Sequence, residues 1–407
     1  MLEKLKLPKS FEKIAYMGFG MALSAVLNFL LLAVVAKVLD VPTFGKYALI
    51  TSILVGLARL TDFGTNSIYV AKSIIEVKQD IVKRYVSAKI LLFLAGIPIS
   101  LGILLSLGYS RNIEILLFLT GFGLYGIKYA LFGFFQKVEA YTALIVLEVL
   151  PSVIKGVIAL LAYLGTINFG YTEFWGTFTL SLLPTLFLIP FCPVKMPKIN
   201  LRKGCELLKE SFSPGTAQLT SENFPAITNS FAKIFGNFTN VGIFSLANKI
   251  SVVFMLASHS IFTVLLPKNA LKSKKGSGYD YKETGLLALG LLVLGFLAAT
   301  IGRFFIIQFF GDKFSDSLPL LNILIVSSAI TAIHTFMENY FYVEGKTHFL
   351  AKIYGLKVGV FIIAAILLIP GFSLQGLIWS QLIASFITLA TVYWLTRQPL
   401  PSRSLFP

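Results

Sequence analysis

Charged residues are scarce in this chain of 407 residues. Asp, Glu, Lys and Arg together make up 13% of it, whereas 56% of the residues are hydrophobic. The mean hydropathy is +0.81. A soluble domain of this length needs far more polar surface, so the composition excludes a soluble protein and indicates one embedded in lipid.

Residues that build metal and redox sites are equally few. The two cysteines, Cys192 and Cys205, flank one loop that we expect in the cytoplasm, where thiols stay reduced. Their spacing matches no metal motif. The three histidines are scattered, and no two of them lie one helical turn apart as in zinc hydrolases. The sequence therefore predicts no metal and no cofactor.

The acidic residues form no catalytic cluster. No two of the six aspartates are adjacent, so the chain lacks the aspartate cluster that would hold magnesium against a pyrophosphate. His334 lies four residues before Glu338, on the same face of a predicted helix. We interpret this pair as packed or cavity-lining, and we do not expect an enzyme. A membrane enzyme acting on lipid-linked sugars stays a weaker alternative.

Long apolar runs are what the chain has in abundance. Each is about 20 residues or more, enough to cross a bilayer as a helix, and none alternates as a barrel strand does. We predict twelve spans, at residues 12–36, 43–70, 85–108, 112–136, 141–164, 170–191, 210–235, 240–266, 284–310, 318–342, 348–370 and 374–395. The predicted fold class is an all-α polytopic membrane protein.

The basic residues set the orientation. With twelve spans both termini lie on one side, whose loops carry 22 lysines and arginines against 4 in the opposite loops. Loops rich in Lys and Arg stay in the cytoplasm. We therefore expect a multi-pass protein of the inner (cytoplasmic) membrane with both termini cytoplasmic. The net charge of +16 is spread over all the inner loops, so we expect no nucleic-acid partner.

The chain repeats itself near its midpoint. Ala36-Lys37-Val38, Thr43, Gly45 and Tyr47-Ala48-Leu49 reappear as Ala232-Lys233-Ile234, Thr239, Gly242 and Phe244-Ser245-Leu246. Many transporters are built from duplicated hydrophobic halves, with the substrate site between them. We predict two lobes of six helices, 1–195 and 210–407, joined by a cytoplasmic linker at 196–209.

Polar side chains inside the predicted spans are candidates for substrate binding. A charge at the bilayer centre costs on the order of 2.5–3.5 kcal/mol, so it should face protein or water. The candidates are Arg59, Asn66, Lys128, Lys155, Gln218, Asn229, Lys249 and Lys357. Together they predict a mixed, largely basic cavity.

A second set of side chains is a candidate for ion coupling or charge balance. It consists of Asp62, Glu148, Glu222, His334 and Glu338. Arg59 and Asp62 could equally neutralise each other within one helix. Glu148 and Lys155 lie about 10 Å apart along the helix axis, too far to pair. We expect each of them to have a partner on another helix or in water.

Several segments resemble one family. After the first span the chain reads AKVLDVPTFGKYALITSILVGLARLTDFGTN, with Phe-Gly-x-Tyr at 44–47 and Asp-x-Gly at 62–64. This opening is similar to that of the polysaccharide transporters, the O-antigen and capsule flippase branch of the multidrug/oligosaccharidyl-lipid/polysaccharide (MOP) superfamily. FFGDKFSDSLPLLNIL (309–324) and LIPGFSLQGLIWSQLIAS (368–385) resemble later segments of the same family.

The resemblance implies a MATE-like fold, with two six-helix pseudo-symmetric lobes around a central cavity that opens to one side at a time. It also implies a substrate whose sugar head enters the cavity while its polyprenyl tail stays in lipid. The chain departs from the family at Asn229, where members often carry an acidic residue, so Glu222 remains the candidate carboxylate.

We therefore expect a flippase that carries a polyprenyl-pyrophosphate-linked oligosaccharide, such as an O-antigen or capsule repeat unit, to the outer leaflet. The basic residues would offset the pyrophosphate charge, and Asn66, Gln218 and Asn229 would bind sugar hydroxyls. A polysaccharide polymerase or glycosyltransferases are the expected neighbours. The alternative on the same fold is a drug or metabolite antiporter, which should need an acidic cavity.

Overall fold

The computed structural model describes residues 9–75, 80–194, 197–251, 281–338, 340, 341, 346 and 348–398, and every element within these ranges is helical. Helices satisfy their backbone hydrogen bonds internally, which is what a lipid environment demands of apolar segments. Eight of the described helices are long and apolar enough to cross a membrane. The predicted class, an all-α multi-pass membrane protein, is confirmed.

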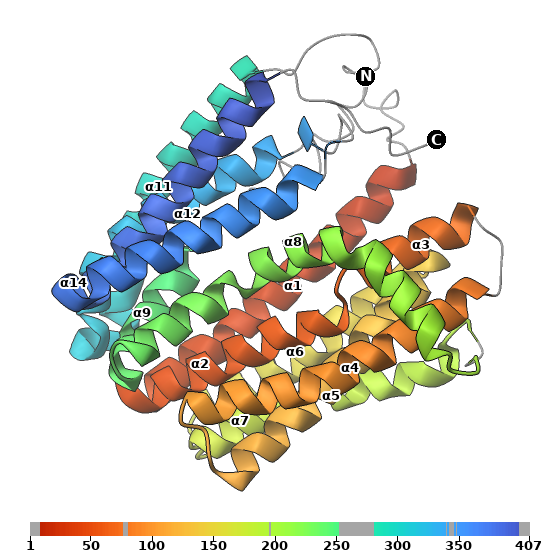
Figure 1. Cartoon of the computed structure of the whole chain (residues 1–407). Coiled ribbons are helices and arrows are strands. Elements are labelled where there is room, and N and C mark those ends of the chain that lie inside the picture. The colour runs from red at the N-terminus through yellow and green to blue at the C-terminus, as the bar shows by residue number, and fades with distance from the viewer. Residues whose placement is uncertain are drawn as a thin grey trace, which may run out of the picture. The chain divides into compact units, whose positions relative to one another are not determined.

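The elements follow the predicted spans in order (Figure 1). They are α1 (Lys9–Val38), α2 (Val41–Ala58), η1 (Arg59–Thr61), α3 (Thr65–Ile75), α4 (Asp80–Ser106), α5 (Asn112–Lys137), α6 (Tyr141–Tyr163), α7 (Tyr171–Leu180), η2 (Leu183–Phe191), α8 (Leu201–Ile234), α9 (Phe238–Ser251), α11 (Tyr281–Phe310), η3 (Gly311–Phe314), α12 (Ser317–Met337) and α14 (His348–Arg397). The predicted span at 240–266 lies only partly within the described residues.

The long helix α14 contains two of the predicted spans. Ser373 interrupts it with a backbone φ of 51° and ψ of −130°, outside the helical region. Beyond it, a Cβ added to Gly376 would overlap the carbonyl oxygen of Leu368. Residues eight apart in a straight helix are about 12 Å apart along its axis. The chain therefore turns back at Ser373, where the sequence predicts a break between 370 and 374.

The second predicted span is broken instead of continuous. α2 tightens into η1, and the chain then turns through Phe63 and Gly64, with φ of 43° and 69°, before α3 begins. Left-handed backbone is favourable for glycine and costly for most other residues. The Asp-x-Gly motif at 62–64 therefore marks a helix break, a feature that in transporters often accompanies a binding site.

The chain divides into two compact units: unit 1, formed by Met1–Asp40 and Ile50–Gly215, and unit 2, formed by Val41–Leu49 and Thr216–Pro407. The division after Gly215 falls inside α8. In unit 1, α1 packs along α6, and α5 packs against α3, α4, α6 and α7. In unit 2, α12 packs against α9, α11 and α14.

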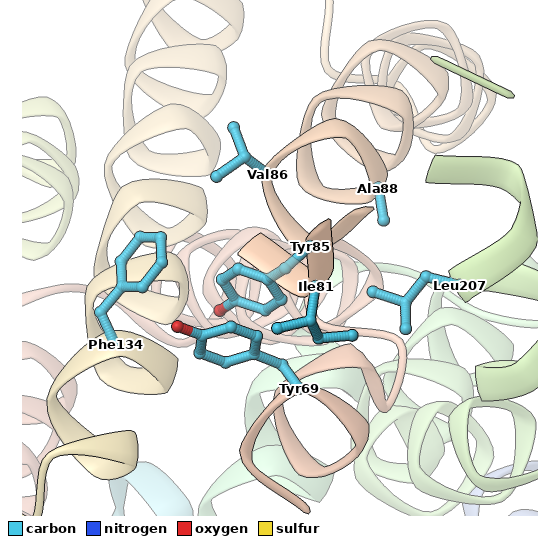
Figure 2. Close-up of a cluster of buried hydrophobic side chains, with 7 residues drawn as sticks. All are labelled: Tyr69, Ile81, Tyr85, Val86, Ala88, Phe134 and Leu207. Atoms are coloured by element: carbon cyan, nitrogen blue, oxygen red, sulfur yellow. The ribbon is translucent and has the colours of Figure 1, made fainter. Parts of the chain in front are cut away.

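A cluster of large apolar side chains holds the first residues of α8 in unit 1. Figure 2 shows Tyr69 stacked on Tyr85, with Phe134 of α5 on one side and Leu207 of α8 on the other. The ring centroids of the two tyrosines are 4.2 Å apart. Glu210, one turn after Leu207, forms ion pairs of 2.9 Å with Lys72 and 2.8 Å with Arg84.

The two copies of the sequence repeat meet in unit 2. A Cβ added to Gly45 would overlap the carbonyl oxygen of Phe238, and a Cβ added to Gly242 would approach the carbonyl oxygen of Val41. Each glycine thus faces the residue four positions before the other glycine. This reciprocal pattern is the signature of a two-fold contact between like segments. The repeat brings the beginnings of α2 and α9 into direct backbone contact.

Candidate functional site

Nine of the thirteen polar residues predicted inside the spans lie in three clusters, two in unit 1 and one in unit 2. We name them the Asp62 cluster, the Lys155 cluster and the His334 triad. Each joins side chains from at least two helices that are distant in sequence, so none follows from the sequence of one helix alone.

The Asp62 cluster surrounds the break in the second span. The Oδ1 of Asp62 accepts hydrogen bonds from the backbone N–H of Asn66 and from Nζ of Lys89, both at 3.2 Å. Nζ of Lys89 also donates to the carbonyl oxygen of Thr61 at 3.0 Å. Asp62 therefore stabilises the first turn of α3, whose exposed N–H groups favour a negative charge, and neutralises a buried lysine.

Asn66 and Arg59 are bound to protein groups in the same cluster. The side chain of Asn66 donates to the carbonyl oxygen of Tyr129 at 3.1 Å and accepts from the hydroxyl of Tyr85 at 2.6 Å. The guanidinium of Arg59 lies 4.7 Å from the centre of the Tyr129 ring. These contacts give both predicted binding residues a structural role at the helix break.

The Lys155 cluster joins α1, α5 and α6. Nζ of Lys128 forms an ion pair of 2.8 Å with Glu148, one turn before Ser152 on α6. Nζ of Lys155 donates to Oδ1 of Asn28 on α1 at 3.1 Å. As expected from their separation, Glu148 and Lys155 each find a partner on another helix.

Hydroxyl groups complete the Lys155 cluster. The amide nitrogen of Asn28 donates to Oγ of Ser152 at 2.8 Å, and Ser152 lies 2.7 Å from Oγ of Ser24. Nζ of Lys155 also lies 4.1 Å from the centre of the Phe178 ring on α7. Lys128 and Lys155 are 7% and 3% exposed. The cluster therefore holds two buried lysines and one glutamate among neutral hydrogen-bonding groups.

The His334 triad joins α12 to α14. Nδ1 of His334 lies 3.2 Å from Oε1 of Glu338, and Nε2 lies 3.4 Å from Nζ of Lys357. The hydroxyl of Tyr354 donates to both oxygens of Glu338, at 2.9 and 3.1 Å. His334, Glu338 and Lys357 are all buried. The structure thus brings together three residues that the sequence could only place on two separate helices.

The remaining predicted residues lie on α8 and α9. The amide nitrogen of Gln218 donates to Glu222 at 3.2 Å, and both side chains are half-buried. Asn229 is 2% exposed and accepts a hydrogen bond of 2.8 Å from Ser245 on α9. Lys249 is exposed. These two hydrogen bonds, Gln218 to Glu222 and Ser245 to Asn229, are separate from the contacts that define the three clusters.

Several residues of the three clusters were not predicted from the sequence, among them Lys89, Asn28 and Tyr354. Lys89 carries a signal, because it is a lysine inside the predicted span 85–108 and charges in spans need partners. Asn28 is an amide within an otherwise apolar first helix, which is a weaker signal of the same kind. Tyr354 lies three residues before Lys357 on the same helical face. Its link to Glu338 depends on how α12 and α14 pack, which the sequence does not show.

Comparison with known proteins finds no matching family model and no matching curated sequence. Solved structures do match. A multidrug resistance MATE family transporter of the MOP superfamily in the inward-facing conformation gives a TM-score of 0.68 at 16% identity, covering 92% of this chain and 94% of that chain. The chain has the fold of the MATE transporters.

Two further structures agree with this assignment. The outward-facing conformation of a MATE family transporter of the MOP superfamily gives a TM-score of 0.61 at 15% identity, covering 94% of this chain and 93% of that chain. A mutant of the Vibrio cholerae MATE transporter VcmN gives 0.59 at 14% identity, covering 97% of both chains. The expected MATE-like fold is confirmed, while membership of the MOP superfamily and of its polysaccharide branch stays a prediction.

Proposed function

We propose that this protein is a transporter that moves a polyprenyl-pyrophosphate-linked oligosaccharide from the inner to the outer leaflet of the cytoplasmic membrane by alternating access. Transport as the general activity is supported by the fold, which matches inward-facing and outward-facing MATE transporters over more than nine-tenths of the chain. The flippase branch is supported by the sequence segments that resemble it.

The observation that carries the choice of substrate is the charge of the Lys155 cluster. Glu148 balances Lys128, and Lys155 has the neutral amide of Asn28 and the ring of Phe178 as its partners. The cluster thus holds one more positive than negative charge. A buried cation without a matching carboxylate stabilises an anionic ligand, and a phosphate oxygen is a strong acceptor for it.

The surrounding groups suit the rest of such a substrate. Asn28, Ser24 and Ser152 provide amide and hydroxyl groups next to Lys155. These groups both donate and accept hydrogen bonds, as recognition of sugar hydroxyls requires. Lys155 would bind the pyrophosphate, and the amide and hydroxyls would bind the adjacent sugar. The polyprenyl tail would stay in the bilayer.

The carboxylates of the three clusters argue against a cationic drug as substrate. Asp62 is bound to Lys89, Glu148 to Lys128, and Glu338 to Tyr354 and His334. A drug cation would have to displace these partners. One observation favours the antiporter alternative: Glu222 is half-buried on α8 beside the amide of Gln218. An antiporter would use Glu222 to bind its cation.

Location and partners belong to the same proposal. The excess of basic residues in one set of loops supports cytoplasmic termini. A lipid-linked glycan must be assembled on one side of the membrane and polymerised or transferred on the other. Glycosyltransferases and a polysaccharide polymerase are therefore the partners that this activity requires. Genes of those two classes next to the gene of this protein would support the assignment.

Reconstitution with a substitution at Lys155 tests the proposal. Purified protein in vesicles should move a fluorescent polyprenyl-pyrophosphate oligosaccharide to the opposite leaflet. Lys155→Met should slow this movement about tenfold to a hundredfold, because a hydrogen bond to a charged group is worth about 1.5–3 kcal/mol. Lys198→Met, the same change at an exposed lysine, is the matched control and should leave the rate unchanged.

Two outcomes would contradict the proposal. The first is normal movement of the glycan lipid by a folded Lys155→Met variant. The second is export of a cationic dye by the wild type that depends on Glu222 and not on Lys155. That second result would establish the antiporter alternative.

A further inference from the structure

The contacts of the His334 triad fit one arrangement of protons. With Lys357 as an ammonium group, which only donates hydrogen bonds, Nε2 of His334 at 3.4 Å from its Nζ is the acceptor. A neutral imidazole has one donor and one acceptor nitrogen. Nδ1 of His334 therefore carries the ring proton and donates a hydrogen bond to Oε1 of Glu338 at 3.2 Å.

We assign the charges so that the triad is neutral overall: Glu338 is the carboxylate, Lys357 the ammonium group, and His334 the neutral imidazole between them. The hydroxyl of Tyr354 gives Glu338 additional donors, at 2.9 and 3.1 Å. Removing either charge would leave the other buried without its counter-charge, which is strongly unfavourable. If Lys357 moves away, a proton on Nε2 of His334 would restore the balance.

We propose that Lys357 and a proton compete for Nε2 of His334, so that drawing the ammonium onto an anionic group leaves a proton in its place. The proton comes from water and binds Nε2, Glu338 stays a carboxylate beside the imidazolium, and Lys357 keeps its charge at the anion. No bond other than N–H forms. In the cell the anion would be an anionic group of the proposed substrate, so this half of the inference rests on the proposed function.

The surroundings allow Lys357 to move. Its Nζ lies 4.8 Å from the centre of the Phe224 ring on α8 and 3.5 Å from Oγ1 of Thr331. Phe224 is half-buried and directly precedes Pro225, where the helix lacks an N–H donor. The Phe224 ring, which also packs against Phe361 at 5.2 Å between ring centres, is therefore one of the groups that lie against the ammonium. Thr331 continues into a hydroxyl chain through Ser385, at 3.0 Å, to Ser327, at 3.1 Å.

No other charge in the described part of unit 2 contacts His334. Glu338 lies on its own helix, and α14 contributes Tyr354 and Lys357. The basic residues Lys249 of α9 and Arg303 of α11 are exposed, and the structure gives neither of them a contact with the triad. Among the charged groups of this part of the chain, Glu338 and Lys357 are therefore the ones that contact His334.

The first test needs no substrate. Full-length protein with isotope-labelled histidine is studied by NMR in nanodiscs, and the His334 signals are those lost in His334→Gln. We expect a neutral wild-type ring with its proton on Nδ1. In Lys357→Met, His334 should take up a proton at a pH about one unit or more higher than in wild type. Lys352→Met, one turn away at an exposed position, should leave His334 unchanged.

A wild-type His334 with its proton on Nε2 would overturn the inference, even if Lys357→Met does not fold. Identical titration of His334 in wild type and in folded Lys357→Met would overturn it as well.

The second test uses inorganic pyrophosphate as the anion. Calorimetric titrations in two buffers of different ionisation enthalpy give the number of protons bound with the ligand. Wild type should take up more protons than His334→Gln, by a difference approaching one proton for each pyrophosphate. His348→Gln, the same change at a histidine outside the triad, should match wild type.

The outcomes separate the inference from the proposed function. Pyrophosphate binding with equal proton uptake in wild type and His334→Gln would refute the competition and leave an anionic substrate standing. Absence of pyrophosphate binding would refute the anionic site, while the NMR result would still decide the competition between Lys357 and the proton.

Discussion

At the scale of single residues, the buried lysines differ in how their charges are balanced. Lys89 and Lys128 each have a carboxylate, at 3.2 and 2.8 Å, whereas Lys155 is bound to an amide oxygen. A lysine with a carboxylate partner is stable without a ligand. A lysine with neutral partners gains most from an incoming anion. The three lysines therefore should respond differently to the same substitution.

Glu148→Gln tests the structural role of the pair with Lys128. It leaves Lys128 buried without its carboxylate, and breaking a buried pair costs about 3–5 kcal/mol. Because the Glu148 side chain is 26% exposed, we expect the lower end of that range. The double variant Lys128→Met/Glu148→Gln should recover most of the loss. Denaturant unfolding in micelles measures the free energy of unfolding of the single and the double variant. A double variant no more stable than Glu148→Gln alone would contradict the pairing.

The residue types of these clusters could be predicted, but their partners could not. Lys128, Lys155, Asp62, His334, Glu338 and Lys357 are visible in the sequence as charges or titratable groups inside apolar spans. Which of these side chains come into contact depends on how the helices rotate and pack against one another, and the sequence does not show this. Lys128 therefore looks like a free cation in the sequence and is a paired one in the structure. The assignment of Lys128, Lys155 and Lys357 to substrate binding, and of Asp62, His334 and Glu338 to ion coupling or charge balance, stays a prediction.

At the scale of the elements, the sequence repeat and the helix break carry the most information. The repeat predicts two related segments, and the structure places their glycines in reciprocal backbone contact. The Asp-x-Gly motif is visible at 62–64, yet the apolar run from 43 to 70 reads as one continuous helix. The break depends on Asp62 bonding the N–H of Asn66 and on Gly64 adopting positive φ. Hydrophobicity carries no signal for either.

Gly45→Ala tests the contact between the repeats. The added methyl group would overlap the carbonyl oxygen of Phe238, so α2 and α9 must separate. Overpacking of this kind costs about 1–3 kcal/mol. We expect a lower melting temperature and reduced transport. Gly102→Ala, at a helical position with no atom within 4 Å of the new methyl group, is the control and should be neutral or slightly stabilising. Equal stability of the two variants would show that the contact is dispensable.

At the scale of the whole molecule, topology follows from composition more directly than any site does. The charge bias of the loops predicts the side of each loop without knowledge of packing. The hydrophobic runs, by contrast, predict twelve similar spans, whereas the described helices differ in length and continuity. Among the described residues, eight helices have the length and hydropathy of a membrane helix. One of them, α14, contains two of the twelve predicted spans. The polar helix α8 is continuous from Leu201, inside the predicted linker at 196–209, to Ile234.

Cysteine labelling tests the predicted orientation. In a background with Cys205 replaced by Ser, Arg111→Cys and Ser315→Cys should react with an impermeant maleimide in intact cells, and Arg202→Cys should not. All three positions are exposed in the structure. Burial raises the pKa of the Cys192 thiol, so this native cysteine should give little background. Labelling at 202 from outside would reverse the assigned orientation.

The energy source is a property of the whole molecule, and Glu222 is a half-buried carboxylate on α8 whose part in it can be tested directly. When the inside of the membrane is negative, a head group with about two negative charges gains roughly 4–5 kcal/mol per 100 mV on moving outward. That is enough to drive transport without an ion. In vesicles with the pH gradient and the potential imposed separately, we expect the potential alone to drive wild type and Glu222→Gln equally. The bond from Gln218 shows that Glu222 can serve as a plain hydrogen-bond acceptor, a role that an amide oxygen can take over. Wild-type transport that responds to the pH gradient and loses that response in Glu222→Gln would instead assign proton coupling to Glu222.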